Sequence, residues 1–332
     1  MNSTIFPSLI EAELEKALSG ADGTLLEMCS HTAKAGGKRI RPLLVLYSGL
    51  VFSGLSDELV KASVASELIH MASLVHDDII DHSELRRNKP SLNYLWGNHL
   101  SVLGGDYLFA RAFGTLSGNR LLKSLDLMIE AIESMCRGEI LQAQNKFKSD
   151  MDLSSYYSQI AGKTAVFFQC CCQSGASISC MDQNQLHALG EYGLNLGLAF
   201  QMVDDILDFF GDIKKMGKPA GEDLRQGIIT LPVILLLSDD KYGSTVSELI
   251  RTQRFEAHEI EMVNSMLTES GAIDRSFKIA NTHIDKARIS LDALPRSEYT
   301  DFLCKLPDLL QANFIQCSEL ANTPKDPANM VI

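Results

Sequence analysis

The residues best suited to chemistry are two groups of three aspartates that share one spacing. The stretches VHDDIIDH and QMVDDILD carry them as Asp77, Asp78 and Asp81 and as Asp204, Asp205 and Asp208. On a helix, residues four apart share a face, so the first and third aspartates of each group lie one above the other. Like charges at this spacing oppose helix formation by a few tenths of a kcal/mol, so each group needs a cation.

The surroundings of the two groups favour a metal site. A single D-D-x-x-D motif is more often a solvated acidic patch, but both copies here are embedded in apolar residues such as Val75 and Ile206. We expect the six carboxylates of the two helices to face each other across a cleft. Oxygen-only ligands favour Mg²⁺, which carboxylates typically share with substrate phosphates. Zinc is disfavoured because cysteine and histidine do not join the carboxylates at ligand spacing.

Cationic residues that could bind phosphates occur in small clusters. They are Lys38, Arg39 and Arg41 beside Gly36 and Gly37, then Arg86 and Arg87, Lys163, and Lys218 in a glycine-rich loop with Asp223. Gly162-Lys163-Thr164 resembles the end of a P-loop, but the first glycine of that motif falls on Tyr157, so a Walker A site is excluded. One basic pair alone is usually a solvated face, whereas several beside two carboxylate groups indicate a diphosphate site.

The elements that must position these residues are helices. Apolar residues recur at three- and four-residue intervals through ELIHMASLVHDDIID and LHALGEYGLNLGLAFQMVDDILDFF, and strand-like alternation is scarce. The pattern predicts an all-α protein of about a dozen helices in one domain over residues 1–320, with a disordered tail at 321–332. Glycines at 190, 193 and 197 predict a helix that another backbone approaches closely.

Composition narrows the class of protein. The 332 residues carry a net charge of −12, so no nucleic-acid footprint is visible. The eight cysteines form no C-x-x-C pair and are read as small buried residues in a reducing compartment. No signal peptide and no membrane span is apparent, so we expect a cytoplasmic protein with at most peripheral membrane contact for product release.

The order of these motifs along the chain resembles that of a known protein family. GGKRIRP, DDIID followed by RR, GKT, and QMVDDILD followed by GKPAGEDLRQG occur in the order typical of the trans-type isoprenyl diphosphate synthases. The resemblance runs from about Gly36 to Pro232. It implies an all-helical bundle around a deep central cavity, and Mg²⁺-dependent head-to-tail condensation of an allylic diphosphate with isopentenyl diphosphate.

The resemblance also assigns site residues. Both aspartate groups are implied to bind Mg²⁺, and Asp77, Asp78, Asp81, Lys163, Asp204 and Asp205 to be catalytic. The residues implied to bind isopentenyl diphosphate are Lys38, Arg41, His70 and Arg87. Those implied to contact the allylic diphosphate are Arg86, Lys163, Thr164, Gln201 and Lys218.

Product length is expected to depend on the helix before the first aspartates. Members that stop at short products typically carry an aromatic plug four or five residues before the motif, where this chain has Ser73 and Ala72. With Ile69 one turn deeper, these residues predict an open channel, whose floor we place around 104–109. The chain therefore resembles medium- and long-chain enzymes, such as the catalytic subunits of heptaprenyl or octaprenyl diphosphate synthases, which supply quinone side chains.

Three departures from the family pattern stand out. Asn88 replaces the glycine usual after the paired arginines, Ile228 replaces a common lysine, and the C-terminus lacks the basic residues of short-chain members. Since some medium-chain synthases have two components, we expect either a homodimer or a heteromer with a small regulatory subunit.

Other functions remain open. Geranylgeranyl diphosphate synthase is one alternative within the family. A class I terpene cyclase is disfavoured because its second metal motif mixes Asn/Asp, Ser/Thr and Glu, whereas DDILD repeats the first motif. A non-catalytic subunit should have lost aspartates, and all six remain.

Overall fold

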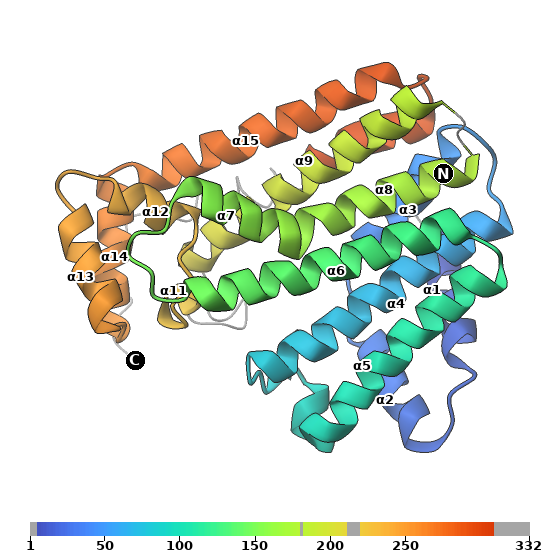
Figure 1. The fold of residues 1–332 in the computed structure, drawn as a ribbon, viewed down its shortest axis with the longest axis horizontal. Coiled ribbons are helices and arrows are strands. Elements are labelled where there is room, and N and C mark those ends of the chain that lie inside the picture. Colours follow the sequence, from blue (N-terminus) through green and yellow to red (C-terminus); the bar gives the residue numbers. More distant parts are fainter. Residues whose placement is uncertain (1–4, 180–181, 211–219, 309–332) are drawn as a thin grey trace, which may run out of the picture. The chain divides into compact units, whose positions relative to one another are not determined.

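The computed structural model describes residues 5–179, 182–210 and 220–308 (Figure 1). These residues form two compact units. The first comprises the described parts of Met1–Arg137, Gly162–Gly197 and Lys286–Leu303, and the second those of Gly138–Ala161, Leu198–Asp285 and Cys304–Ile332. The single domain over 1–320 stays a prediction, and the tail at 321–332 lies outside the described residues.

The described chain is almost entirely helical, which confirms the all-α prediction. The α-helices are α1 (Ile5–Leu18), α2 (Gly23–Lys34), α3 (Ile40–Leu50), α4 (Asp57–Ile80), α5 (Leu92–Gly118), α6 (Leu122–Asn145), α7 (Leu153–Ile160), α8 (Val166–Ser179), α9 (Gln183–Leu207), α11 (Glu222–Arg225), α12 (Leu231–Leu237), α13 (Gly243–Thr252), α14 (Ala257–Glu269) and α15 (Ala272–Ser290). Short segments add a π-helical turn η1 (Ala161–Ala165), 3₁₀ turns η2 (Asp208–Phe210) and η3 (Leu291–Ala293), and strands β1 (Leu85–Arg86) and β2 (Lys89–Pro90).

Helix α4 carries the first aspartate group at its C-terminal end. The Ser56 side chain accepts a hydrogen bond from the Leu59 N–H, and Asp57 and Glu58 occupy the first turn, so the start of the helix is well capped. Between its ends α4 is buried over most of its length, and it packs beside α5 (Figure 1). The buried middle therefore fixes the position of the helix end where the carboxylates lie.

Helices α3 and α8 pack in direct backbone contact. A Cβ atom on Gly175 of α8 would collide with the main-chain carbonyl of Val45 in α3. Nearer the N-termini of both helices, the Arg41 guanidinium lies 5.1 and 5.0 Å from the ring centroids of Phe167 and Phe168. The two helices are thus in contact at two places along their length.

The glycine stripe of α9 packs as predicted. A Cβ atom on Gly193 would lie 2.6 Å from the Phe168 carbonyl oxygen, and one on Gly197 would lie 2.6 Å from the Ala165 Cα. The absence of side chains at these positions lets α9 approach the backbone of η1 and α8.

The prediction that the cysteines are buried holds for four of the six described residues, since Cys136 is exposed and Cys304 is half-buried. Six cysteines are free, and the four at positions 29, 170, 171 and 172 are buried. No helix in the described part of the chain is long and apolar enough to cross a membrane.

Candidate active site

The first aspartate group lies where α4 ends. Asp77 and Asp78 are in the last turn, whereas Asp81 follows the helix and its N–H donates to the Asp77 carbonyl at 2.8 Å. We expected the helix to include Asp81, but it ends one residue earlier, at Ile80. Asp77 and Asp81 are still one helical turn apart. Helix C-termini carry partial negative charge, so carboxylates there favour a bound cation even more strongly.

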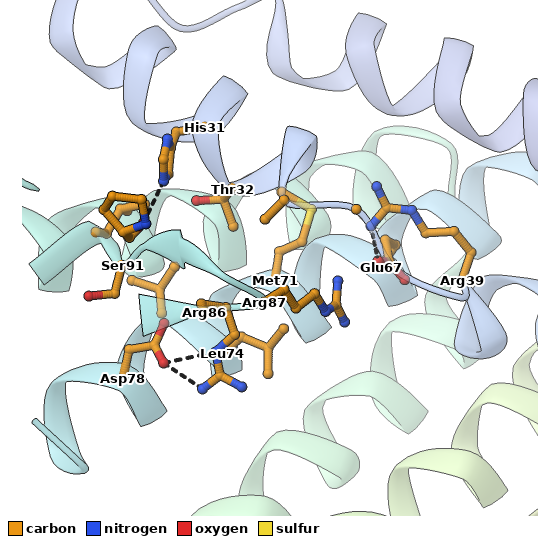
Figure 2. Close-up of a pocket in the computed structure, with 15 residues that line it drawn as sticks. His31, Thr32, Arg39, Glu67, Met71, Leu74, Asp78, Arg86, Arg87 and Ser91 are labelled. Atoms are coloured by element: carbon orange, nitrogen blue, oxygen red, sulfur yellow. Dashed lines mark hydrogen bonds and ion pairs between the residues drawn. The ribbon is translucent and has the colours of Figure 1, made fainter. Parts of the chain in front are cut away.

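Asp78 already has a cationic partner. Its side chain is 6% exposed, and its Oδ1 accepts from Arg86 Nε at 2.8 Å and Arg86 Nη2 at 2.5 Å (Figure 2). Asp81 is half-buried. The structure thus brings Arg86, which we predicted to contact the allylic diphosphate, directly to the first aspartate group.

A hairpin that the sequence did not predict presents the two arginines. Strands β1 and β2 pair antiparallel, with Arg86 opposite Lys89, and the two residues between them are Arg87 (φ 52°) and Asn88 (φ 61°). Two successive left-handed residues are the signature of a type I′ turn. Asparagine tolerates this conformation better than other residues with a side chain, which explains how Asn88 can replace glycine.

The predicted isopentenyl diphosphate residues form a cationic cluster in the first unit. Arg41 Nη1 lies 3.3 Å from His70 Nε2. Burial and the nearby Arg41 and Arg87 charges hold the pKa of His70 well below its usual value, so the imidazole is neutral and its Nε2 can accept. Burial also lowers the pKa of Arg41 and of Arg87. Lys38 is exposed and precedes Arg41 closely in the sequence.

Figure 2 shows a pocket beside these arginines, which is partly open to solvent. Arg39, Arg86, Arg87 and Asp78 line it together with residues the sequence analysis did not single out, among them His31, Thr32, Glu67, Met71 and Ser91. His31 Nε2 lies 2.7 Å from the Pro90 carbonyl, and its ring contacts Trp96 edge-on, so α2 is tied to the hairpin.

The GKT motif lies in the π-helical turn η1, between α7 and α8. Lys163 is half-buried and Thr164 is buried. Such single π turns inside helices frequently occur at functional sites, because the extra residue changes the direction of side chains. The sequence predicted a helix here but gave no sign of this irregularity.

The second aspartate group repeats the placement of the first at the end of α9. Asp204 is exposed and Asp205 is buried in the last turn, and Asp208 begins η2. Asp205 Oδ2 accepts from the Tyr156 hydroxyl at 2.6 Å and Oδ1 accepts from Gln201 Nε2 at 2.8 Å. Burial, followed by the charges of Asp223 and Asp204, raises the pKa of Asp205 well above its usual value.

Asp208 organises the loop that follows. Its carbonyl accepts from the Gly221 N–H at 2.9 Å, and its Oδ2 accepts from the Asp223 N–H at 3.2 Å. Asp223 therefore joins the second carboxylate cluster, which the spacing in the sequence did not predict. Lys218 lies outside the described residues.

The donors present fit a hard divalent cation. Both clusters offer carboxylate oxygens at a helix C-terminus, and the charges of Asp223 and Asp204 add to the effect of burial in raising the pKa of Asp205. Within the described residues, neither group brings ligand atoms of all three aspartates within 4.8 Å of one another. Mg²⁺ is usually held by one or two carboxylates together with substrate phosphates, and carboxylates of either group could serve as such ligands.

The residues predicted to set product length lie on α4 below the first aspartates. Ile69 and Ala72 have no exposed surface, whereas Ser73 is half-buried and its hydroxyl donates to the His70 carbonyl at 2.9 Å. Ser73 is one turn before Asp77 and shares its face.

Comparison with known proteins places the chain in a family. The polyprenyl synthetase family matches residues 22–267. The heptaprenyl diphosphate synthase component 2 of Geobacillus stearothermophilus is 38% identical over 289 residues, covering 87% of this chain and 90% of that protein. The geranylgeranyl diphosphate synthase of Saccharolobus solfataricus is 35% identical, covering 83% and 86%.

A solved structure agrees with these relatives. A polyprenyl synthase from Caulobacter crescentus CB15, complexed with calcium and isoprenyl diphosphate, is 32% identical, covers 92% of this chain and 95% of its own, and gives a TM-score of 0.85. The helical fold and these similarities define a prenyltransferase with the isoprenoid synthase fold. The chain belongs to the polyprenyl synthetase family.

Proposed function

We propose that this prenyltransferase uses Mg²⁺ to condense an allylic diphosphate head-to-tail with isopentenyl diphosphate, giving a medium- or long-chain all-trans product. The observation that carries the proposal is the repeated placement of three aspartates at a helix C-terminus, at α4 and again at α9. A cation would relieve the repulsion among carboxylates at these positions, and these carboxylates would share it with a substrate diphosphate.

Each group of residues has a role in the proposed reaction. The two aspartate groups would hold Mg²⁺, and the bound metal would neutralise charge that develops on the departing diphosphate. Arg86, Lys163, Thr164, Gln201 and Lys218 would contact the allylic diphosphate. Lys38, Arg41, neutral His70 and Arg87 would hold isopentenyl diphosphate so that its double bond attacks the allylic carbon as the carbon–oxygen bond breaks. The protein supplies electrostatics, positioning and exclusion of water, and the released diphosphate takes the proton.

The ion pair between Arg86 and Asp78 has a role in the substrate-free state. Asp78 is buried, and an unpaired buried carboxylate would be costly. Arg86 compensates that charge until metal and diphosphate arrive, and its guanidinium is then available for the phosphate oxygens.

The growing prenyl chain is proposed to pass Ser73, Ala72 and Ile69. Small side chains near the aspartates leave the path open, which supports a product longer than that of short-chain members. The similarity to a heptaprenyl synthase component favours medium length, and the archaeal relative keeps a geranylgeranyl product as the second candidate. Quinone side chains are the proposed destination of the product.

A partner chain and a cytoplasmic location are also proposed. The relative from Geobacillus is named as one component of its synthase, which supports either a heteromer with a small regulatory subunit or a homodimer. Exposed apolar side chains on α5, including Val102 (41%) and Leu103 (52%), are consistent with association.

Incubation of the purified chain with Mg²⁺, isopentenyl diphosphate and farnesyl diphosphate tests this function. The products are sized by chromatography, with the chain alone and with candidate partner subunits. A ladder of products ending beyond 20 carbons supports the proposal, and a product that stops at 20 carbons favours the geranylgeranyl alternative. No elongation under any of these conditions refutes the proposed activity.

A further inference from the structure

Glu67 is a buried carboxylate that the proposed mechanism leaves without a role. It lies on α4, ten residues before Asp77, and is 3% exposed among apolar neighbours such as Leu68 and Ile69. A charged group at such a position costs several kcal/mol unless it is paired. Its presence in the middle of a buried helix therefore requires a specific partner.

The partner of Glu67 is Arg39. Arg39 Nη1 donates to Glu67 Oε1 at 2.5 Å, and both side chains are buried (Figure 2). Arg39 also donates to Glu11 of α1 at 2.7 Å and to the Ala33 carbonyl of α2 at 3.0 Å. The three cations that the sequence grouped together are thus divided, because Lys38 is exposed while Arg39 points into the protein and joins three helices.

The backbone around Arg39 carries the proposed isopentenyl diphosphate site. Arg39 itself has a left-handed φ of 50° and immediately precedes α3, between exposed Lys38 and half-buried Arg41. A residue with a side chain holds this conformation only when its surroundings fix it. The ion pair with Glu67 supplies that constraint, so it sets where Lys38 and Arg41 lie.

The second carboxylate oxygen of Glu67, Oε2, makes no hydrogen bond within the described residues. It is buried, and Arg41 Nε is likewise buried without an acceptor among these residues. The Glu67 charge also stabilises the charged forms of Arg41 and Arg87. One carboxylate therefore offsets the mutual repulsion of three guanidinium groups before any diphosphate binds.

We infer that Glu67 is a positioning residue for isopentenyl diphosphate, acting through Arg39 on the placement of Lys38 and Arg41. This inference rests on the proposed function of those two residues. It predicts that loss of the Glu67 charge weakens isopentenyl diphosphate specifically, although Glu67 is an anion in a site for an anionic substrate.

The test compares Glu67→Gln with Glu11→Gln, which removes the other acidic partner of Arg39. The Glu11 side chain is 48% exposed, so its ion pair contributes little. The KM values for isopentenyl diphosphate and for the allylic diphosphate are measured separately. Calorimetry in EDTA gives the Kd of isopentenyl diphosphate, without any metal contribution. Glu67→Gln should raise the KM and Kd for isopentenyl diphosphate about tenfold, with the allylic KM and both Glu11→Gln values within about twofold.

Several outcomes would overturn the inference. They are a lower melting temperature with unchanged isopentenyl diphosphate affinity, equal changes for both substrates, and tighter binding by Glu67→Gln, which would mean that Glu67 only repels substrate. If Glu67→Gln folds poorly, the double variant Arg39→Met/Glu67→Met replaces the pair with apolar side chains, which often restores stability. Weak isopentenyl diphosphate binding by the folded double variant supports the inference, and wild-type affinity refutes it.

The same experiment separates this inference from the proposed function. A wild-type chain that neither binds isopentenyl diphosphate nor elongates an allylic primer, alone or with a partner, refutes the function itself. An active wild-type chain with an unaffected Glu67→Gln variant refutes only the role of Glu67.

Discussion

Tyr156 and Tyr157 are adjacent residues whose hydroxyls have different partners. Tyr156 donates to Asp205, whereas the Tyr157 hydroxyl lies 3.0 Å from His283 Nε2. The bond from Tyr156 lowers the pKa of Asp205, although burial and the neighbouring carboxylates outweigh it. Tyr156, together with Gln201, therefore offsets part of the effect of burial on Asp205.

We expect Tyr156→Phe to raise the pKa of Asp205 further, so that more of this carboxyl is protonated near neutral pH. The acidic limb of the kcat/KM profile should move to higher pH, and the Mg²⁺ concentration for half-maximal activity should rise. The free energy of unfolding should fall by about 1–2 kcal/mol. Tyr157→Phe is the matched control, and an identical shift of both acidic limbs would contradict the assignment to Asp205.

The buried thiols give a second prediction, which concerns how the free energy of unfolding depends on pH. Burial raises the pKa of Cys170 from 9.0 to about 12. A thiol whose pKa is higher in the folded state contributes stability that is complete below the unfolded pKa and is lost as pH rises towards the folded value. Above pH 9 this loss should be about 1.4 kcal/mol per pH unit for this thiol. Denaturant unfolding of Cys170→Ala at pH 7.5 and pH 10 should therefore show a smaller difference than wild type, and an equal difference would refute the argument.

At this scale the sequence predicts residue types better than partners. The aspartates, Arg41, His70 and Arg86 were identified because their motifs are local. Glu67 and Tyr156 were missed because their partners are 28 and 49 residues away, so no spacing records the contact.

Among the elements, α4 joins the proposed reaction site to the proposed prenyl path. Ser73 is one turn before Asp77, whereas Ala72 is one turn before His76, whose ring occupies the space beside Gly105 of α5. The two neighbouring small residues therefore lie on different faces of the helix.

This geometry sharpens the expectation for product length. Ser73→Phe should shorten the product with little loss of stability, because its position is only half-buried. Ala72→Phe should also shorten the product, but overpacking at a fully buried site should cost about 1–3 kcal/mol of stability. Product chromatography and melting temperatures measure both effects, and an unchanged product distribution from both variants would refute the channel assignment.

The hairpin turn gives a prediction about Arg87. Asn88→Gly should retain stability and isopentenyl diphosphate affinity because glycine adopts positive φ freely. Asn88→Val should cost about 1–2 kcal/mol and raise the KM for isopentenyl diphosphate, since a distorted turn displaces Arg87. Equal melting temperatures and KM values for the two variants would show that the turn does not position this arginine.

The existence of the elements was predictable, and their irregularities were not. Apolar periodicity identified α4 and α9 because a buried helix face repeats every three or four residues. Three features escaped, namely the helix ends at Ile80 and Leu207, the π turn η1, and the hairpin, whose strands are two residues each. Each depends on a few backbone angles rather than on a repeating pattern.

For the whole molecule, the proposed metal dependence predicts that chelation abolishes activity reversibly. EDTA should stop elongation, and added Mg²⁺ should restore it. Mg²⁺ together with inorganic pyrophosphate should raise the melting temperature more than the sum of their separate effects, because each completes the other's site. Full activity in EDTA, or strictly additive thermal shifts, would contradict shared coordination.

The backbone contact between α3 and α8 has a consequence for how this sequence can vary. Arg41 begins one helix and Phe167 and Phe168 begin the other, while Gly175 lies against Val45 without room for a methyl group. Consider a library that contains every amino acid at position 175, in cells whose growth depends on the activity of this enzyme. Nearly all surviving clones should carry glycine at that position. Because the contact is with the main chain of α3, no side-chain substitution on that helix makes room at position 175, so this glycine should stay fixed while the side chains around it vary.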